Sequence, residues 1–199
     1  MDIQEYKPTI LLLSGKKQSG KDTAGKLLQQ YNYSCVAFGD ELKNKCTILA
    51  NSILELNISS NYFHDNKLKE TDIYIPFLQK NVTPRYLLQT FGTAFIRNCI
   101  HEDYWSLFLV NEIKNKYKGK NIVITDVRFP NEIEIITHNL KDFYNIYTIR
   151  IIRNNSTIQN DLHISETALD CYSKWDFIIN NDSTIISFHE KLTKIIECL

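Results

Sequence analysis

A short apolar run, a loop bounded by glycines and a helix follow one another at the start of the chain, and this order constrains the fold most. Residues 9–14 read TILLLS, which is typical of a β-strand buried on both faces. Residues 15–20 are a loop with a glycine at each end. Residues 21–31 place Ala24 and Leu28 on one side of a helix. The order predicts the first unit of a parallel α/β sheet.

Further short segments rich in β-branched and aromatic residues alternate with helical patterns along the chain. The predicted strands are 34–38, 121–125, 146–152 and 176–180, and the predicted helices are about 40–56, 83–99, 104–116, 130–139 and 184–198. This alternation indicates an α/β fold with a parallel sheet of about five strands and helices on both faces. The polar stretches 57–71 and 154–161 are expected to be surface loops.

Length and charge narrow the class of protein. The 199 residues fit one domain, and 23 basic residues balance 23 acidic ones, so stable nucleic-acid binding is not expected. No apolar run approaches the roughly 20 residues of a membrane span, and the acidic, polar N-terminus is unlike a signal peptide. The five cysteines contain no CxxC pair, which favours reduced thiols in a cytoplasmic protein.

The glycine-bounded loop carries a phosphate-binding motif. Residues 15–23 read GKKQSGKDT and match the Walker A pattern GxxxxGK. In such a loop the backbone N–H groups point at phosphate oxygens, the lysine contacts the β- and γ-phosphates, and the helix adds its positive end. The pattern predicts that ATP is bound through Gly15, Lys17, Ser19, Gly20, Lys21, Asp22 and Thr23.

The motif departs from its usual form at one position. Where a serine or threonine normally coordinates Mg²⁺, the chain has Asp22, with Thr23 one step later. Asp22 is a candidate magnesium ligand through water, and it equally suits the first turn of a helix as a partner for the helix dipole. Thr23 is a candidate for a hydrogen bond to a phosphate oxygen.

Asp126 and Arg128 follow directly on the predicted strand 121–125, at the carboxyl edge of the sheet where ligands of open α/β folds bind. Asp126 is a candidate for holding Mg²⁺ through water or for accepting a proton. Arg128 is a candidate for bidentate binding of a phosphate. The alternative is a helix-capping aspartate followed by a surface arginine.

The helix predicted at 83–99 has an unusual polar side. Thr83 suits its N-cap, and Arg85, Gln89 and Arg97 fall broadly on one side, as a phosphorylated, hydrogen-bonding substrate would require. A solvated face is the alternative. Gly92 interrupts the helix where a ligand or another backbone could approach closely.

Trp105 and residues 180–183 each have two interpretations. Trp105 either packs in the core or stacks on a nucleobase. Residues 180–183 either lie near the adenine of ATP or start the last helix, at Asp182 or Ser183.

A second cationic loop follows the strand 146–152. Arg153 lies just beyond the strand end and is the better candidate for a lid cation that reaches the transferring phosphoryl group, whereas Arg150 falls within the strand. His163 and Glu166 either position the lid or bind substrate, and Ser165 alternatively caps a short helix.

Taken together, these segments resemble the deoxynucleoside monophosphate kinases of bacteriophages and other large DNA viruses. The anchors are GKKQSGKDTAG from Gly15, TPRYLLQTFGTAFIR from Thr83, ITDVRFPNE from Ile124 and HISETAL from His163. The second anchor, in that order with the others, is the specific one. Ala94 stands where the family pattern often carries an acidic residue after Gly-Thr. If that acid contacts the acceptor in relatives, the specificity of this chain is expected to differ.

The resemblance implies a P-loop NTPase-type kinase fold in one domain, 1–199, with a helical substrate segment about 40–118 and a lid about 153–166. It implies phosphoryl transfer from ATP with Mg²⁺ to a small-molecule deoxynucleoside monophosphate, in the cytoplasm, and in a host cell if the chain is viral. Lys21 and the loop amides would bind ATP. Arg85, Arg97 and Arg128 would hold the acceptor, and Arg153 would close over the transferring group. Many proteins of this architecture are dimers, which leaves a homodimer open.

Two other functions remain open at this stage. Phosphomevalonate kinases of animals share a loop of the GKxxSGKD type, but their acceptor is a small phosphorylated acid. A regulatory module that binds ATP without transferring phosphate is the second. The helix 83–97 argues against a phosphomevalonate kinase. A regulatory module is disfavoured by the presence together of Lys21, Asp126, Arg128 and Arg153.

Overall fold

The computed structural model describes residues 7–153 and 164–199. The chain divides into two compact units, one made of Met1–Ala37 with Ser106–Leu199 and the other of Phe38–Trp105. Within the described residues, no helix combines the length and apolar character needed to cross a membrane.

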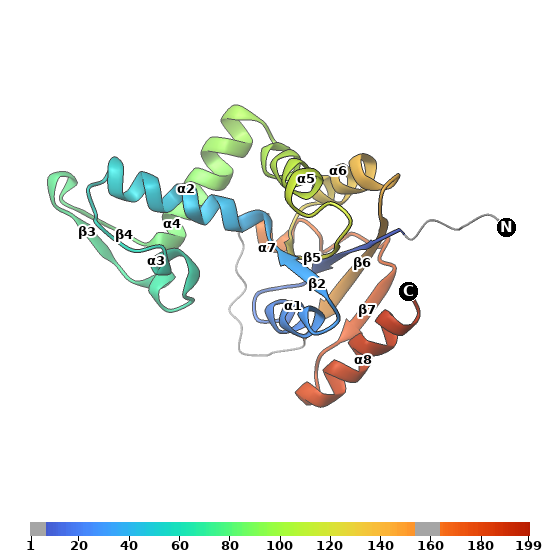
Figure 1. Cartoon of the computed structure of the whole chain (residues 1–199). Helices are drawn as coiled ribbons and strands as arrows, with labels where there is room; N and C mark the ends of the chain where they lie inside the picture. Colours follow the sequence, from blue (N-terminus) through green and yellow to red (C-terminus); the bar gives the residue numbers. More distant parts are fainter. Residues whose placement is uncertain (1–6, 154–163) are drawn as a thin grey trace. The chain divides into compact units, whose positions relative to one another are not determined.

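The first unit is a parallel sheet between two layers of helices (Figure 1). Five strands hydrogen-bond in the order β2-β5-β1-β6-β7, and every pair is parallel. The elements are β1 (Thr9–Ser14), α1 (Lys21–Gln29), β2 (Tyr33–Val36), α5 (Tyr104–Lys116), β5 (Asn121–Val127), α6 (Pro130–Leu140), β6 (Asn145–Ile152), α7 (Ile164–Thr167), β7 (Phe177–Asn180) and α8 (Ile185–Glu197).

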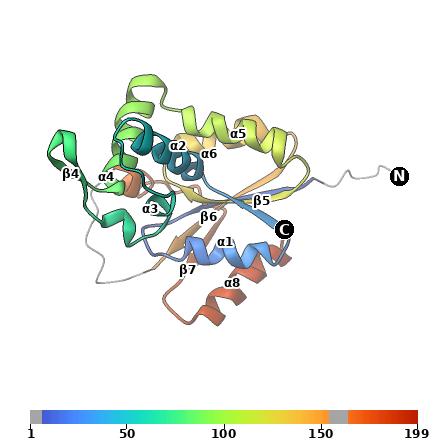
Figure 2. The same cartoon turned by 60° about the vertical axis from the view of Figure 1, so that its left-hand side comes forward.

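Burial explains why β1 is central. All six of its residues are buried, because β5 pairs with one edge and β6 with the other while helices cover both faces. Figures 1 and 2 show α1 and α8 on one face of the sheet and α5 and α6 on the opposite face. Leu28 of α1 and Phe188 of α8 join one buried cluster with the strand residues Leu11 and Val123. The predicted fold class is therefore confirmed.

The strand order fixes where a ligand site can form. From β1 the chain connects to β2 on one side of the sheet, and from the adjacent β6 it connects to β7 on the other side, so the connections leave these two neighbouring strands in opposite directions. In parallel α/β sheets, ligands bind outside the carboxyl ends of the strands at such a reversal. The loops after β1, β5, β6 and β7 all start at this edge.

The second unit is mainly helical. It contains α2 (Phe38–Ser52), α3 (Asn61–His64), α4 (Pro84–Gln89), a π-helical segment η3 (Thr90–Ile100) and a two-stranded antiparallel sheet of β3 (Ile73–Ile75) and β4 (Lys80–Val82), with single 3₁₀ turns η1 (Leu68–Glu70) and η2 (Pro76–Leu78). Cys46, Ala50 and Phe63 form its buried core, with Leu87 and Phe91 packed against them.

Three expectations about this region were wrong in detail. Phe38, predicted to end a strand, begins α2. The stretch 57–71, predicted as a surface loop, contains α3 and η1, because the fully buried Phe63 anchors it. The β3–β4 hairpin was not predicted, since strands of three residues are too short to show an alternating pattern.

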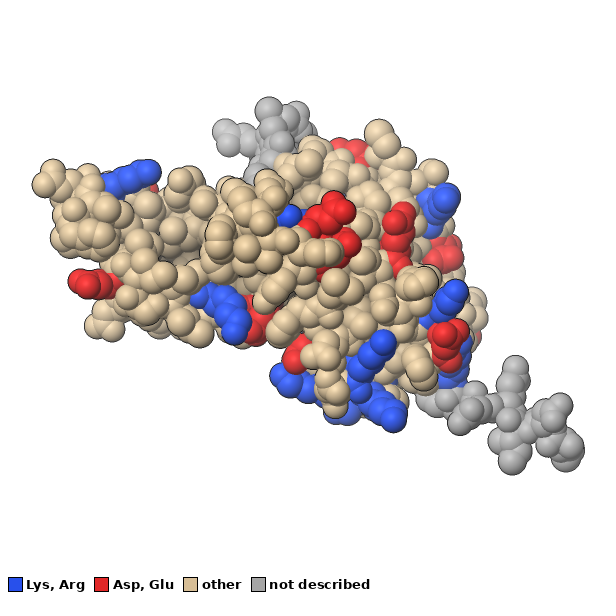
Figure 3. Space-filling view, turned by 90° about the horizontal axis from the view of Figure 1, so that it is seen from above, with Lys and Arg blue, Asp and Glu red and all other residues tan. Residues whose placement is uncertain are grey.

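Charges are distributed in keeping with a formal net charge of zero. Figure 3 shows acidic and basic side chains interspersed over the face that it presents. Several pair along helices, with Lys45 Nζ 3.1 Å from Glu41 Oε1 and Lys116 Nζ 2.5 Å from Glu112 Oε2. Such exposed i,i+4 pairs add only a few tenths of a kcal/mol each.

Candidate active site

The loop between β1 and α1 has the backbone conformation of an anion cradle. Gln18 and Gly20 have φ of 63° and 110°, and the amide of Ser19 donates to the carbonyl oxygen of Lys16 at 3.1 Å. When residues within a tight turn adopt the left-handed backbone conformation, successive N–H groups point to one side of the turn, where they can bind an anion. The local geometry is therefore that of a phosphate-binding loop.

Both glycines of the loop are required by close contacts. A Cβ on Gly15 would lie 2.4 Å from the carbonyl oxygen of Ile151 and from Ser19 Oγ. A Cβ on Gly20 would lie 2.5 Å from Asn181 Nδ2 and would also suffer the positive φ. The loop thus packs so tightly against β6 and the segment after β7 that no side chain fits at either position.

Asn181 connects the loop to the end of β6 through two hydrogen bonds. Its side-chain amide donates to the Ser19 carbonyl oxygen at 2.8 Å, and its backbone N–H donates to the Ile152 carbonyl oxygen at 2.7 Å. The last helix is capped by Thr184, whose Oγ1 accepts from the Ser187 amide at 3.2 Å, in keeping with the helix predicted at 184–198. Of the two interpretations of residues 180–183, a helix start at Asp182 or Ser183 is therefore wrong.

Lys21 lies over the loop as a buried cation. Its Nζ donates to the carbonyl oxygens of Gly15 at 2.6 Å and Lys16 at 2.8 Å, and the residue is only 7% exposed. Burial, with a smaller contribution from the Arg128 guanidinium, lowers the pKa of Lys21 to about 8, against the opposing effects of Glu166, Asp22 and Asp126. Lys21 therefore shares its surroundings with Asp126 near the end of β5 and with Arg128 directly after it.

Glu166 of α7 connects the loop to Arg128. One carboxylate oxygen accepts from the backbone N–H of Lys17 at 3.1 Å, and the other pairs with Nη1 of Arg128. The two side chains of this ion pair are 11% and 28% exposed, respectively. The structure thus brings together Lys17, Lys21, Arg128 and Glu166, which the sequence predicted as separate candidates.

Glu132 sets the backbone at Arg128. This carboxylate is 3% exposed, and its Oε2 accepts from the amides of Arg128 at 2.7 Å and Phe129 at 3.0 Å. It lies in the first turn of α6, where a negative charge favours the helix dipole. Glu132 was not among the predicted site residues, although a proline at the first helical position with glutamate at the third is a known start signal.

A second ion-pair network holds the loop from the side of β6. Asp170 Oδ2 lies 2.6 Å from Lys16 Nζ, and its Oδ1 lies 3.3 Å from Nη2 of Arg150. Arg150 also donates to Ser14 Oγ at 2.9 Å, and its guanidinium lies 5.6 Å from the ring centre of Trp175. Burial is the main reason that the pKa of Arg150 is lowered. Nothing in the sequence pattern indicated Asp170.

Two carboxylates suited to a metal, those of Asp22 and Asp126, lie close enough to Lys21 to raise its pKa. Asp22 is exposed in the first turn of α1. Asp126 is half-buried at an irregularity of the sheet, since β5 has one extra residue between the pairs Leu12–Ile124 and Ser14–Val127. Among the described residues there is no cluster of three or more His, Cys, Asp or Glu that could hold a metal. One or two carboxylates suffice for Mg²⁺ that is also bound by phosphates and water.

The remaining lid candidates are only partly described. Arg153 is exposed immediately after β6. His163 lies outside the described residues, as does most of the predicted lid. Ser165 lies within α7 and does not precede it.

The second unit contains the predicted substrate helix. Thr83 caps α4, with its Oγ1 accepting from the Tyr86 amide at 3.1 Å, as predicted. Arg85 Nε lies 2.5 Å from Glu70 Oε1 of η1. Gln89 is half-buried at the end of α4, and Arg97 is half-buried in η3 beside a pocket of about 530 Å³ that includes His101 and Glu102. Glu70 carried no signal in the sequence.

Gly92 and Trp105 have packing roles in this unit. A Cβ on Gly92 would lie 2.6 Å from Leu42 Cδ2, so the close approach predicted here is made by a side chain of α2. Trp105 is buried, and its indole N–H donates to the Gly92 carbonyl oxygen at 3.1 Å. Of the two interpretations of Trp105, the structure favours packing.

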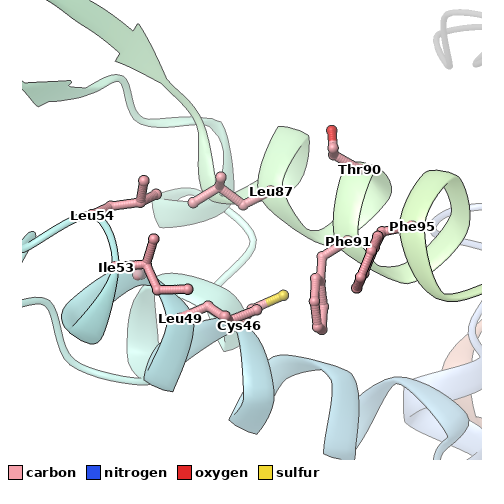
Figure 4. A pocket seen from close by; sticks show the side chains of 9 residues that line it. Cys46, Leu49, Ile53, Leu54, Leu87, Thr90, Phe91 and Phe95 are labelled. Carbon is pink, nitrogen blue, oxygen red and sulfur yellow. The ribbon is translucent and has the colours of Figure 1, made fainter. Parts of the chain in front are cut away.

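An apolar pocket of about 210 Å³ lies between α2 and the α4–η3 helix (Figure 4). Phe91 and Phe95 face side chains of α2 across it, and the Thr90 hydroxyl points away. Burial raises the pKa of the Cys46 thiol in its wall to about 12, which leaves this cysteine an unreactive thiol.

The motif and its setting assign the class, and comparison with known proteins assigns the family. The Walker A sequence lies in the turn between a central parallel strand and a helix, which is the arrangement of a P-loop protein. Residues 41–192 match the family described as deoxynucleotide monophosphate kinase, and the chain belongs to this family. The predicted family resemblance is confirmed.

One curated relative and two solved structures illustrate the similarity. The chain is 32% identical over 129 residues to the deoxynucleoside-5'-monophosphate kinase of Escherichia phage T5; the match covers 60% of this chain and 49% of the phage protein, so the chain spans about half of its relative's length. The crystal structure of TT1252 from Thermus thermophilus gives a TM-score of 0.52 at 12% identity, covering 97% of this chain and 98% of that one. The structure of dephospho-CoA kinase from Campylobacter jejuni gives a TM-score of 0.50 at 16% identity, covering 94% of this chain and 95% of that one. The two structures support the fold alone.

Proposed function

We propose that this protein transfers the γ-phosphoryl group of ATP to the phosphate of a free deoxynucleoside monophosphate, giving ADP and a deoxynucleoside diphosphate. The observation that carries the proposal is the gathering of Lys21, Arg128 and the loop amides at the carboxyl ends of β1 and β5, in a member of a family described by this substrate class. The similarity to the deoxynucleoside-5'-monophosphate kinase of phage T5 adds support.

Lys21 and the loop amides are the proposed donor site. The Lys21 ammonium is held by two loop carbonyl oxygens, which are weaker partners than a phosphate. When ATP binds, the ammonium exchanges these carbonyls for the β- and γ-phosphate oxygens. The network around Asp170 and Asn181 keeps the loop in shape during this exchange.

Arginines are the proposed acceptor ligands and charge stabilisers. Arg128 of the first unit is a proposed ligand of the acceptor phosphate. Within the second unit, taken by itself, Arg85, Gln89 and Arg97 are proposed ligands of the deoxynucleotide. Arg153 would approach the transferring group from the lid. The burial of Trp105 argues against a stacking role for that ring.

The proposed reaction needs positioning and positive charge. The bond between the γ-phosphorus and the β–γ bridging oxygen breaks, and an acceptor phosphate oxygen forms the new bond to that phosphorus. The acceptor phosphate is already largely ionised near pH 7, so Asp126 is not required as a base. Lys21 and the arginines stabilise the charge of the transition state. Magnesium, when bound, supplies further positive charge at the phosphates, and Asp22 and Asp126 are the residues that would hold it.

The test is the release of ADP from ATP and Mg²⁺ with a panel of acceptors: dAMP, dGMP, dCMP, dTMP, dUMP, AMP and phosphomevalonate. Turnover on one or more deoxynucleotides is expected, together with the base preference. Activity on phosphomevalonate alone would assign the other kinase class. ATP binding without turnover on any acceptor would contradict the proposal and favour a regulatory module.

The affinity for ATP is expected to fall as the pH rises above about 8. The folded-state pKa of Lys21 is about 8, and only the protonated amine attracts phosphate, so ATP binding above this pH requires uptake of a proton. The Kd of ATP should then increase towards about tenfold per pH unit. Calorimetric titrations from pH 6.5 to 9.5 measure the slope.

Lys21→Arg is the control for this pH dependence, because arginine stays charged throughout the range. Its affinity is expected to be lower overall but constant with pH. A slope equal to that of the wild type would assign the titration to another group.

A further inference from the structure

Glu166 takes hydrogen-bond donors that the proposed function assigns to phosphate. Its Oε2 accepts from the Lys17 N–H, which belongs to the phosphate-binding loop, and its Oε1 pairs with the Arg128 guanidinium. A loop amide and an arginine fork are the two kinds of group that proteins use most often to bind phosphate oxygens. One carboxylate therefore accepts from both kinds of donor, one with each of its oxygens.

The charges around Glu166 fit the same interpretation. Arg128 lies close enough to Lys21 to disfavour the positive charge of the Lys21 ammonium, and Glu166 opposes this effect. The Glu166 side chain is 11% exposed, so water screens these interactions only partly. A bound phosphate would supply the same negative charge at the same donors.

We propose that Glu166 is an internal competitor for phosphate. Its carboxylate occupies a phosphate position formed by the Lys17 amide and Arg128, and a nucleotide phosphate must displace it. This inference rests on the proposed function of the loop. A carboxylate and a phosphate cannot accept from the same donors together, so part of the phosphate affinity is offset by the loss of the Glu166 contacts.

Displacement of Glu166 links the two halves of the site. Once a phosphate has taken the Lys17 amide, Glu166 leaves and the Arg128 guanidinium is released for the acceptor. Binding of donor and of acceptor should therefore favour each other, and the coupling must be equal in both directions. Without the Glu166 carboxylate, this part of the coupling disappears.

The alternative role of Glu166 predicts the opposite sign. If its contact with Arg128 instead orients the guanidinium productively, removing the carboxylate weakens anion binding. The two roles are therefore separated by the direction of one affinity change.

The test is the binding of inorganic pyrophosphate, without magnesium, to the full chain and to Glu166→Gln, measured by isothermal titration calorimetry. We expect about tenfold tighter binding to the variant, since a charge-assisted contact no longer opposes the ligand. Unchanged or weaker binding would overturn the proposal. Pyrophosphate has no nucleoside, so the result is independent of whether deoxynucleotides are substrates, and a failure of the proposed function remains distinguishable.

A matched variant separates competition from a general gain of positive charge. Glu190→Gln makes the same chemical change at an exposed position of α8 and should leave the pyrophosphate affinity unchanged. An equal gain in Glu190→Gln would mean that charge alone explains the result, and the proposal would fall.

Discussion

Lys21→Ala is expected to lower kcat for phosphoryl transfer by about a hundred- to a thousandfold. The variant loses the one buried ammonium at the phosphate-binding loop, and removing a single preorganised donor of transition-state charge typically has an effect of this size. The measurement is steady-state ADP release with the best deoxynucleotide acceptor at saturating ATP. A separate titration of ATP distinguishes the loss in kcat from weaker binding.

The matched control is Lys26→Ala, an exposed lysine in the last turn of the same helix, which should retain wild-type activity. Unfolding is not expected to explain the loss in Lys21→Ala. Burial disfavours the charged ammonium, so its removal should leave the thermal midpoint equal or higher at pH 7. Activity within about threefold of the wild type would exclude Lys21 from the charge stabilisation described above.

Glu132→Ala is expected to destabilise the folded protein by about 3 kcal/mol. The buried carboxylate accepts from the amides of Arg128 and Phe129, and the variant leaves both donors without this acceptor at the start of α6. Because Glu132 also sets the backbone of Arg128, the KM of the acceptor should rise. Urea unfolding measures the first effect, and acceptor titrations measure the second.

Glu134→Ala is the control on the same helix, since Glu134 is exposed two residues further on. Glu132→Gln should recover part of the stability, because an amide oxygen still accepts one or both bonds. An unchanged urea midpoint for Glu132→Ala would show that the carboxylate does not hold this turn.

Much of the fold follows from the order of apolar segments. The strand at residues 9–14 was predicted with its observed bounds, because a short apolar run that ends at a glycine-bounded loop is typical of a strand covered on both sides. The helix at 104–116 was also predicted at its observed bounds. Phe38 was misassigned because aromatic residues favour strands locally, whereas here the side chain is buried at the start of α2.

The sequence predicted those site residues that belong to a recognisable motif or strand end, but not the contacts between them. Lys21 and Arg128 follow from a loop pattern and a strand end, but their partners come from distant segments. Glu166 and Asp170 reach the loop across about 150 residues of chain, a contact that no local pattern indicates. Arg150 was passed over because it lies in a strand, although its register opposite Ser14 places its guanidinium next to the loop.

Two of the candidate phosphate-binding arginines each form an ion pair with a glutamate. Arg128 pairs with Glu166 in the first unit, and Arg85 pairs with Glu70 in the second. The carboxylate holds the guanidinium in one orientation until a phosphate, which carries more negative charge, replaces the carboxylate as its partner. Both pairs would then break and reform in each catalytic cycle.

The most direct test of the central claim follows the label from ATP that carries ³²P in its γ-phosphate. The wild-type protein is incubated with labelled ATP, Mg²⁺ and each deoxynucleoside monophosphate in turn, and the products are separated by thin-layer chromatography. We predict that the label appears in the matching deoxynucleoside diphosphate, and that Lys21→Ala forms almost none. Label that stays in ATP, or that appears only as inorganic phosphate with every acceptor, would contradict the assignment as a deoxynucleoside monophosphate kinase.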